Sequence, residues 1–211
     1  MNLPPLKHYS EFDSVNYRNK YSLAPSWPFR LLICGASGTG KTNVLVNLIL
    51  QYLTYDKLYV YAKDLCEAKY EFLQDLFKDF PEEAVFSETN DIISVNDIDS
   101  SKQNLIIFDD HLTQKHQSNI IDLFIRGRKK NASTIYLTQS YYGTPKNIRL
   151  QCDYIILMKS CNQREINLIL KEHTVDNTTL MKYDEAVKDP YNFFLIDLRK
   201  NEVRKNFDTV I

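Results

Sequence analysis

Short apolar runs recur along the chain, and stretches with helical spacing separate them. Runs rich in β-branched or aromatic residues are found at Phe29–Cys34, Lys57–Ala62, Asn104–Asp109, Ser133–Gln139 and Asp153–Met158. Runs this continuously apolar are typical of strands that are covered on both faces. Strands that alternate with helical stretches indicate βαβ units, so the pattern predicts an α/β fold with a mostly parallel sheet and helices on both of its faces.

Between and after these runs, the spacing of apolar residues predicts helices and a closing hairpin. The expected helices are Thr42–Leu53, Gln117–Lys129, Gln163–Lys171 and a weaker one at Leu180–Lys188. Two stripes at helical spacing are expected to pack in the core, and they consist of Leu65, Ala68, Phe72 and Leu76, and of Ile120, Ile121, Phe124 and Ile125. Two alternating segments, Phe193–Leu198 and Glu202–Phe207, flank turn residues and predict a C-terminal β-hairpin.

Composition predicts one domain. The chain has 211 residues, of which 44% are hydrophobic and 25% charged, and this is enough for one buried core. We expect the domain at 29–211 after a proline-rich extension at 1–28, which resembles neither a signal peptide nor a membrane anchor. No other segment predicts a membrane span. The four cysteines lack the spacing of a zinc site and are expected to be reduced thiols.

The charged residues are segregated along the chain. The formal net charge of −1 argues against a surface that is entirely a nucleic-acid footprint. Residues 63–99 carry eleven acidic and three basic side chains, whereas residues 123–152 carry six basic side chains and no acid. The basic segment is a candidate for contacts with phosphate, although solvation of the surface explains any one of its lysines equally well.

A glycine-rich loop follows the first predicted strand and opens the first predicted helix. It satisfies the pattern G-x-x-x-x-G-K-[ST] with Gly35, Ala36, Ser37, Gly38, Thr39, Gly40, Lys41 and Thr42. Glycines let the backbone curl so that successive N–H groups face a phosphate. Lys41 is expected to reach the β- and γ-phosphates of ATP, and Thr42 to bind Mg²⁺. Asn43 completes the predicted nucleotide-binding set.

Two carboxylates follow the apolar run Leu105–Phe108, as in a Walker B strand. We expect Asp109 to hold Mg²⁺, directly or through water. Asp110 would then act as the base or orient the attacking water. The alternative is that the two aspartates only form the turn after the strand, and this alternative applies best to chains without a phosphate-binding loop.

The strand that follows ends in Thr138, Gln139 and Ser140. In P-loop ATPases with a strand inserted between the two Walker strands, this end lies beside the γ-phosphate. Gln139 is therefore a candidate sensor of phosphate or of the attacking water. The alternative is an amide that satisfies a buried loop.

Two arginines, Arg126 and Arg128, end the helix before that strand. One of them is a candidate arginine finger that neutralises charge on a neighbouring subunit's γ-phosphate. Contacts to DNA phosphates and surface solvation are the alternatives. The loop at Tyr141–Arg149 carries two aromatic residues and two cations, and it either grips DNA phosphates in a pore or packs its tyrosines on the core.

Together, these motifs resemble the FtsK–HerA superfamily of DNA-pumping ATPases, and within it the genome-packaging ATPases of poxviruses and related large DNA viruses. The resemblance rests on Leu32–Thr42, Ile106–Asp110, Arg126–Asn131, Ile135–Tyr142 and Pro145–Arg149. The spacing of Gly127-Arg128 from Gln139 also matches the superfamily, which favours Arg128 as the finger. Cellular members commonly place Glu where Asp110 stands. Similar sequences occur in virophage-like and Polinton-like elements.

The resemblance implies ATP hydrolysis coupled to packaging of viral-type double-stranded DNA. It implies ATP and Mg²⁺ at the interfaces of a homo-oligomeric ring, expected to be a hexamer, with DNA held by its backbone without sequence preference. A capsid or portal protein is a further expected partner. The expected location is the host cytoplasm or nucleus, or the virion. A small P-loop kinase and a non-catalytic nucleotide-binding protein are the alternatives.

Overall fold

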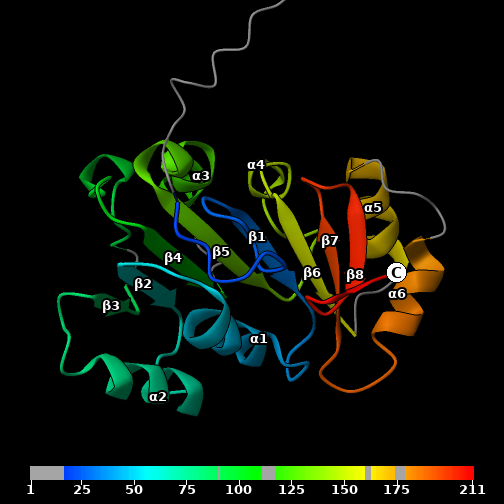
Figure 1. Ribbon diagram of the computed structural model, residues 1–211, viewed down its shortest axis with the longest axis horizontal. Coiled ribbons are helices and arrows are strands. Elements are labelled where there is room, and N and C mark those ends of the chain that lie inside the picture. The colour runs from blue at the N-terminus through cyan, green and yellow to red at the C-terminus, as the bar shows by residue number, and fades with distance from the viewer. Residues whose placement is uncertain (1–16, 90, 111–116, 160–162, 174–178) are drawn as a thin grey trace, which may run out of the picture.

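The computed structural model describes residues 17–89, 91–110, 117–159, 163–173 and 179–211. In these residues, one sheet has the strand order β3-β2-β4-β5-β1-β6-β7-β8-β9 (Figure 1). The parallel strands are β1 (Arg30–Cys34), β2 (Lys57–Ala62), β3 (Ala84–Ser87), β4 (Asn104–Asp109), β5 (Ala132–Thr138) and β6 (Tyr154–Met158). The antiparallel strands are β7 (Phe193–Asp197), β8 (Glu202–Lys205) and β9 (Thr209–Val210).

Helices cover both faces of the sheet, as Figure 1 shows for α1 and α2 on one side and α3 and α4 on the other. The first face packs against α1 (Lys41–Asn47), the π-helical turn Leu48–Tyr52 that continues it, and α2 (Ala68–Phe77). The second face packs against α3 (Ser118–Arg126), α4 (Lys146–Arg149), α5 (Gln163–His173) and α6 (Thr179–Ala186).

The residues of β4 show why the apolar runs are continuous. Successive side chains of a strand point to opposite faces of the sheet. Leu105 and Ile107 pack in the core beneath α1 and α2, whereas Ile106 and Phe108 pack in the core beneath α3. All four side chains are fully buried. Both faces are therefore apolar because each has its own layer of helices.

The predicted fold class is confirmed, including the inserted strand and the C-terminal hairpin. In the sheet, β5 lies between β1, which precedes the glycine-rich loop, and β4, which ends in the two aspartates. The hairpin is formed by β7 and β8. Two short strands at the edges of the sheet, β3 and β9, were not predicted from the sequence. The side chains of β3 are only half-buried, so its apolar pattern is weak.

Of the predicted core stripe, Leu65 is buried as predicted, but the part of the stripe in α2, which begins at Ala68, is wrong. The buried side chains of this helix are Tyr70 and Leu73, whereas Phe72 and Leu76 are 48% and 46% exposed. The helix turns Tyr70 toward the sheet, and this sets which face is buried. Of the other predicted stripe, Ile125 in α3 is 49% exposed, while Ile120 and Phe124 are buried as predicted.

The described part of the N-terminal segment, residues 17–28, packs against the domain. Trp27 is buried, and its Nε1 donates a hydrogen bond of 2.8 Å to Oδ1 of Asn131. Arg204 of β8 donates from Nη1 to the carbonyl oxygen of Leu23 at 2.9 Å. A domain boundary at residue 28 stays a prediction.

Cys34, Cys66 and Cys152 form no disulfide bond among the described residues, and Cys161 lies outside those residues. Among the helices of the described part of the chain, none combines the length and the apolar character that a membrane span requires.

Candidate nucleotide-binding site

A cavity of about 650 Å³ lies where the central parallel strands end. Its lining comes from the glycine-rich loop, α1, the start of α2 and the ends of β4 and β5. The lining residues are Ser37, Gly38, Gly40, Lys41, Thr42, Asn43, Glu67, Lys69, Asp109, Asp110, Leu137, Thr138, Gln139 and Tyr191. Ligands of open parallel α/β sheets bind at this carboxyl edge, so the place of the cavity agrees with the fold.

The glycine-rich loop needs its glycines for two different reasons. Gly38 and Gly40 have φ of 76° and 100°, the left-handed region that side chains disfavour. Gly35 is needed for space, since a Cβ there would lie 2.5 Å from Cβ of Met158 in β6. The backbone can therefore curl tightly beside the sheet. A loop of this kind points its N–H groups at a bound phosphate.

Lys41 folds back over the loop. Its ammonium donates a hydrogen bond of 2.9 Å to the carbonyl oxygen of Ala36, and the hydroxyl of Thr39 donates to the same oxygen at 2.8 Å. Thr42 is half-buried and lines the cavity beside Lys41, and Asn43 is exposed at the rim. The loop thus places a cation and a hydroxyl at one wall of the cavity.

The two aspartates line the same cavity from the end of β4. Asp109 ends β4, and the hydroxyl of Tyr70 in α2 donates a hydrogen bond to its Oδ2. Burial and the charge of Asp109 raise the pKa of Tyr70, so the tyrosine stays protonated as a donor. Asp110 has a φ of 56°, which is uncommon for a residue with a side chain. The chain therefore turns sharply at Asp110, and residues 111–116 lie outside the described residues.

Gln139 follows β5 and lines the same cavity with an exposed side chain. Its neighbour Thr138 is buried and donates from Oγ1 to the carbonyl oxygen of Ser140 at 3.0 Å. Thr138 thus fixes the turn and leaves Gln139 open to the cavity. This exposure favours a role at the ligand over an amide that satisfies a buried loop.

These residues fit a nucleoside triphosphate with Mg²⁺. The cavity volume lies in the usual range for small-molecule sites. The hydroxyl of Thr42 and the carboxylate of Asp109 are oxygen ligands of the kind that Mg²⁺ prefers. Lys41 and the curled backbone supply the positive charge and the donors that a phosphate chain needs.

The two candidate fingers lie away from this cavity. Arg126 ends α3 and Arg128 lies in the 3₁₀ turn before β5, so both stand at the amino edge of the sheet. Gln139 stands at the carboxyl edge, about 20 Å away along β5. Both arginines are exposed, and Arg126 pairs with Asp122 at 2.8 Å. Neither arginine lines the cavity of its own chain.

The loop at Tyr141–Arg149 mostly packs on the core. Tyr141 is fully buried, and its hydroxyl lies 2.8 Å from Oε2 of Glu172 and 2.9 Å from Nε2 of His173. Arg149 pairs with Glu172 at 3.0 Å and lies over the ring of Tyr141. The idea that this loop grips DNA is therefore wrong for Tyr141 and Arg149, because α5 supplies their partners. Tyr142 and Lys146 are exposed.

Sequence reasoning missed several residues of the site. Glu67, Lys69 and Tyr70 come after β2, which lies beside β4 in the sheet. A polar segment after a central parallel strand is a signal that the carboxyl-edge rule provides. Tyr191 is remote in sequence from every motif, and the sequence holds no signal for it.

Solved structures share the fold. The genome packaging NTPase B204 from Sulfolobus turreted icosahedral virus 2, in complex with AMPPCP, matches with a TM-score of 0.61 and 17% identity, over 85% of this chain and 97% of that one. The DNA-packaging ATPase B204 from Sulfolobus turreted icosahedral virus matches with a TM-score of 0.59 and 17% identity, over 86% of this chain and 98% of that one. EssC (ATPases 2 and 3) from Geobacillus thermodenitrificans matches with a TM-score of 0.53 and 10% identity, over 86% of this chain and 38% of that one. Among curated proteins, none matches this sequence.

A family model described as Poxvirus A32 protein matches residues 16–190. That span holds the glycine-rich loop, both aspartates and Gln139. The resemblance to the poxvirus packaging ATPases is therefore confirmed. From the motifs, the fold and this match, we conclude that the chain belongs to the Poxvirus A32 protein family.

Proposed function

We propose that the chain is an ATP-hydrolysing translocase that packages viral-type double-stranded DNA. One observation carries the proposal. A single cavity gathers the lysine of a phosphate-binding loop, two adjacent carboxylates and a glutamine from the ends of neighbouring strands. Phosphoryl transfer is catalysed mainly by positioning and by electrostatic stabilisation, and this set offers both.

Each residue has a distinct role in the proposed reaction. Lys41 and the N–H groups of the loop Gly35–Thr42 hold the β- and γ-phosphates. Thr42 and Asp109 hold Mg²⁺, which when bound neutralises charge on the phosphate oxygens. Asp110 takes a proton from the attacking water, and Gln139 orients that water. Two acids beside a glutamine are suited to the activation of water. They are less suited to the reaction of a kinase, which transfers phosphate to a second substrate.

The arginines favour a site that is shared between subunits. Arg126 and Arg128 stand at the far edge of the sheet from the cavity. In a ring, which we expect to be a hexamer, that edge can face the cavity of the next copy. Arg126 is engaged with Asp122 and with Oδ1 of Asn96, so Arg128 is the better candidate finger.

We further propose that exposed cations of the basic segment hold the DNA backbone without sequence preference. Lys129 and Lys146 are exposed there, as is the aromatic ring of Tyr142. Contacts of this kind neutralise phosphates and do not read bases. A capsid or portal protein is the further partner that packaging needs, in the host cytoplasm or nucleus or in the virion.

The rate of ATP hydrolysis per subunit, measured against protein concentration with and without duplex DNA, tests the proposal. We expect the rate to rise as subunits assemble and to rise again with duplex, because the proposed site is completed by a neighbour. A kinase requires an acceptor molecule, and a binding scaffold does not turn over. Absence of hydrolysis at every concentration, with duplex and Mg²⁺ present, contradicts the proposal.

Replacement of the finger tests the shared site. We expect Arg128→Ala to leave ATP binding intact and to slow assembly-dependent hydrolysis by about 10³-fold, since arginine fingers contribute at least this much. Arg164→Ala, which removes an exposed arginine of α5, is the matched control. A full rate in Arg128→Ala would mean that the finger lies elsewhere.

A further inference from the structure

A second cavity adjoins the first. It has a volume of about 440 Å³, and its walls come from the N-terminal segment, α1 and the residues around β7 and β8. Two residues, Asn43 and Tyr191, line both cavities. The two cavities therefore meet at an asparagine of α1 and at a tyrosine from the loop that connects α6 with β7.

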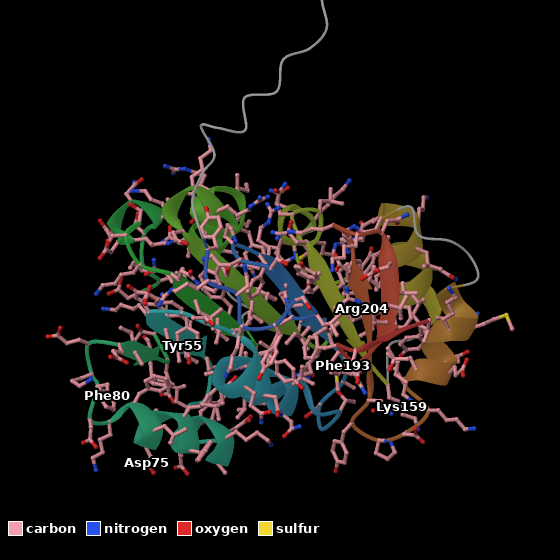
Figure 2. All side chains as sticks on the ribbon, viewed as in Figure 1. Tyr55, Asp75, Phe80, Lys159, Phe193 and Arg204 are labelled. Atoms are coloured by element: carbon pink, nitrogen blue, oxygen red, sulfur yellow. The ribbon has the colours of Figure 1, made fainter. Side chains whose placement is uncertain are left out.

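Tyr191 has an unusual environment for a tyrosine. Its side chain is 73% exposed, and its φ of 68° lies in the left-handed region, which is an outlier for a bulky residue. A third cavity, of about 360 Å³, is lined by Tyr191 together with Lys159. Figure 2 labels Lys159 and Phe193, which flank the loop from the ends of β6 and β7. The ring thus stands between cavities and does not pack in the core.

Hydrogen bonds pin the loop that carries this ring. Asn206 donates from Nδ2 to Oδ1 of Asn192 at 3.0 Å, and its own Oδ1 accepts from the backbone N–H of Phe193 at 3.1 Å. The ring lies beside the phosphate-binding loop, because a Cβ on Gly40 would be 3.5 Å from Cδ1 of Tyr191. Strained backbone persists where its surroundings hold it, and it clusters at ligand sites.

We propose that the second cavity takes the nucleoside half of the bound nucleotide and that the ring of Tyr191 stacks on its base. The inference rests on the proposed function, which places the β- and γ-phosphates at Lys41 and Thr42. In a nucleoside triphosphate the ribose and base lie at the opposite end of the phosphate chain from the γ-phosphate. With the β- and γ-phosphates at Lys41 and Thr42, the nucleoside therefore extends toward the second cavity. Asn43, which follows Thr42, lines both cavities. The second cavity offers the base an aromatic wall, including Tyr52 and Phe207, and amide groups.

Stacking on a tyrosine recognises the flat face that every base has. It therefore adds affinity and discriminates weakly between bases. We expect the affinities for ATP and GTP to depend on Tyr191 by similar factors. Inorganic tripolyphosphate carries the phosphate chain without a nucleoside, and its affinity is expected to be independent of Tyr191.

Calorimetric titration of the full chain with Mg²⁺ and either ATP or tripolyphosphate tests this inference. We expect Tyr191→Ala to lower the affinity for ATP by about tenfold or more and to leave the affinity for tripolyphosphate unchanged. Tyr191→Phe keeps the ring and should bind ATP as the wild type does. Phe80→Ala removes an aromatic ring that is 55% exposed, lines none of these cavities and is labelled in Figure 2 away from Phe193 and Lys159, and it is the matched control.

Three outcomes would overturn the inference. Unchanged ATP affinity in Tyr191→Ala would show that the base lies elsewhere. Equal weakening of ATP and tripolyphosphate would show that the tyrosine shapes the phosphate loop. Wild-type protein that binds neither ligand would overturn the proposed function as well, and this distinguishes the two failures.

Discussion

The two edges of the parallel sheet hold their charged side chains in different ways. At the amino edge, Asp153 accepts from Arg30 at 3.0 Å and pairs with Arg199 at 3.2 Å. Burial raises the pKa of Asp153, but these two guanidinium groups lower that pKa overall. At the carboxyl edge, Lys41 and the two aspartates Asp109 and Asp110 face a common cavity.

Under the proposed function, the charges at the amino edge serve the fold and the charges at the carboxyl edge serve a bound nucleotide. The amino-edge arginines also tie down the N-terminal segment, since Arg199 donates from Nη1 to the carbonyl oxygen of Ser26 at 2.7 Å. Removal of one partner from a buried ion pair leaves the other charge buried without compensation, and this destabilises the fold. We therefore expect changes at the amino edge to alter stability, and changes at the carboxyl edge to alter binding and turnover.

The largest effect is expected for Lys41→Ala, which should abolish measurable binding of ATP. In the proposed site the lysine supplies the cation for the phosphates, while the hydrogen bond from its ammonium to Ala36 contributes little to the fold. The free energy of unfolding should change by less than about 0.5 kcal/mol. Calorimetric titration and urea unfolding measure the two quantities. Lys78→Ala, at an exposed lysine, is the control, and retained ATP binding in Lys41→Ala would refute the role of the lysine.

The opposite result is expected for Asp153→Ala at the amino edge. This change leaves Arg30, whose side chain is only 12% exposed, without its carboxylate partner. Loss of one member of a buried ion pair costs about 3–5 kcal/mol. Urea unfolding measures the loss, and ATP affinity of the folded protein should stay unchanged. The comparison of the two edges fails if stability falls by less than it does in Asp79→Ala, which changes an exposed acid.

A smaller effect is expected for Tyr70→Phe, which removes the hydroxyl that donates to Asp109. Groups that orient a metal ligand commonly change metal affinity or activity by about tenfold. We expect hydrolysis to require about tenfold more Mg²⁺, with little change in stability. The Mg²⁺ dependence of the ATPase rate measures this. Tyr55→Phe removes a hydroxyl that donates to Ile49 instead, and an equal shift in both variants would contradict the assigned contact.

Much of the fold was predictable because the strands are buried on both faces. The runs Lys57–Ala62 and Asn104–Asp109 match β2 and β4 residue for residue, since continuous apolar sequence marks such strands. The face of α2 was not predictable from its own apolar residues. Tyr70 points inward to Asp109, whereas Phe72 and Leu76 are exposed. The contact between Tyr70 and Asp109 joins α2 to the end of β4, and the sequence of α2 alone does not reveal it.

The site was predictable where a local motif carries the chemistry. Lys41, Thr42 and the two aspartates follow strands at fixed places, and the structure gathers them in one cavity. Tyr191 and Glu172 were not predictable, because each acts on residues remote in sequence. Glu172 pairs with Arg149 and so turns a predicted DNA-gripping residue into part of the core.

The most direct test of catalysis at the carboxyl edge is ATP binding and ATP hydrolysis, measured in the same samples of Asp110→Asn and of the wild type. We expect binding within about twofold of the wild type and hydrolysis slower by about 10²-fold or more, as for loss of a general base. Asp75→Asn, at an exposed acid of α2 that Figure 2 labels, should match the wild type in both. Hydrolysis by Asp110→Asn at the wild-type rate, or an equal loss of binding and hydrolysis, would contradict the proposed role.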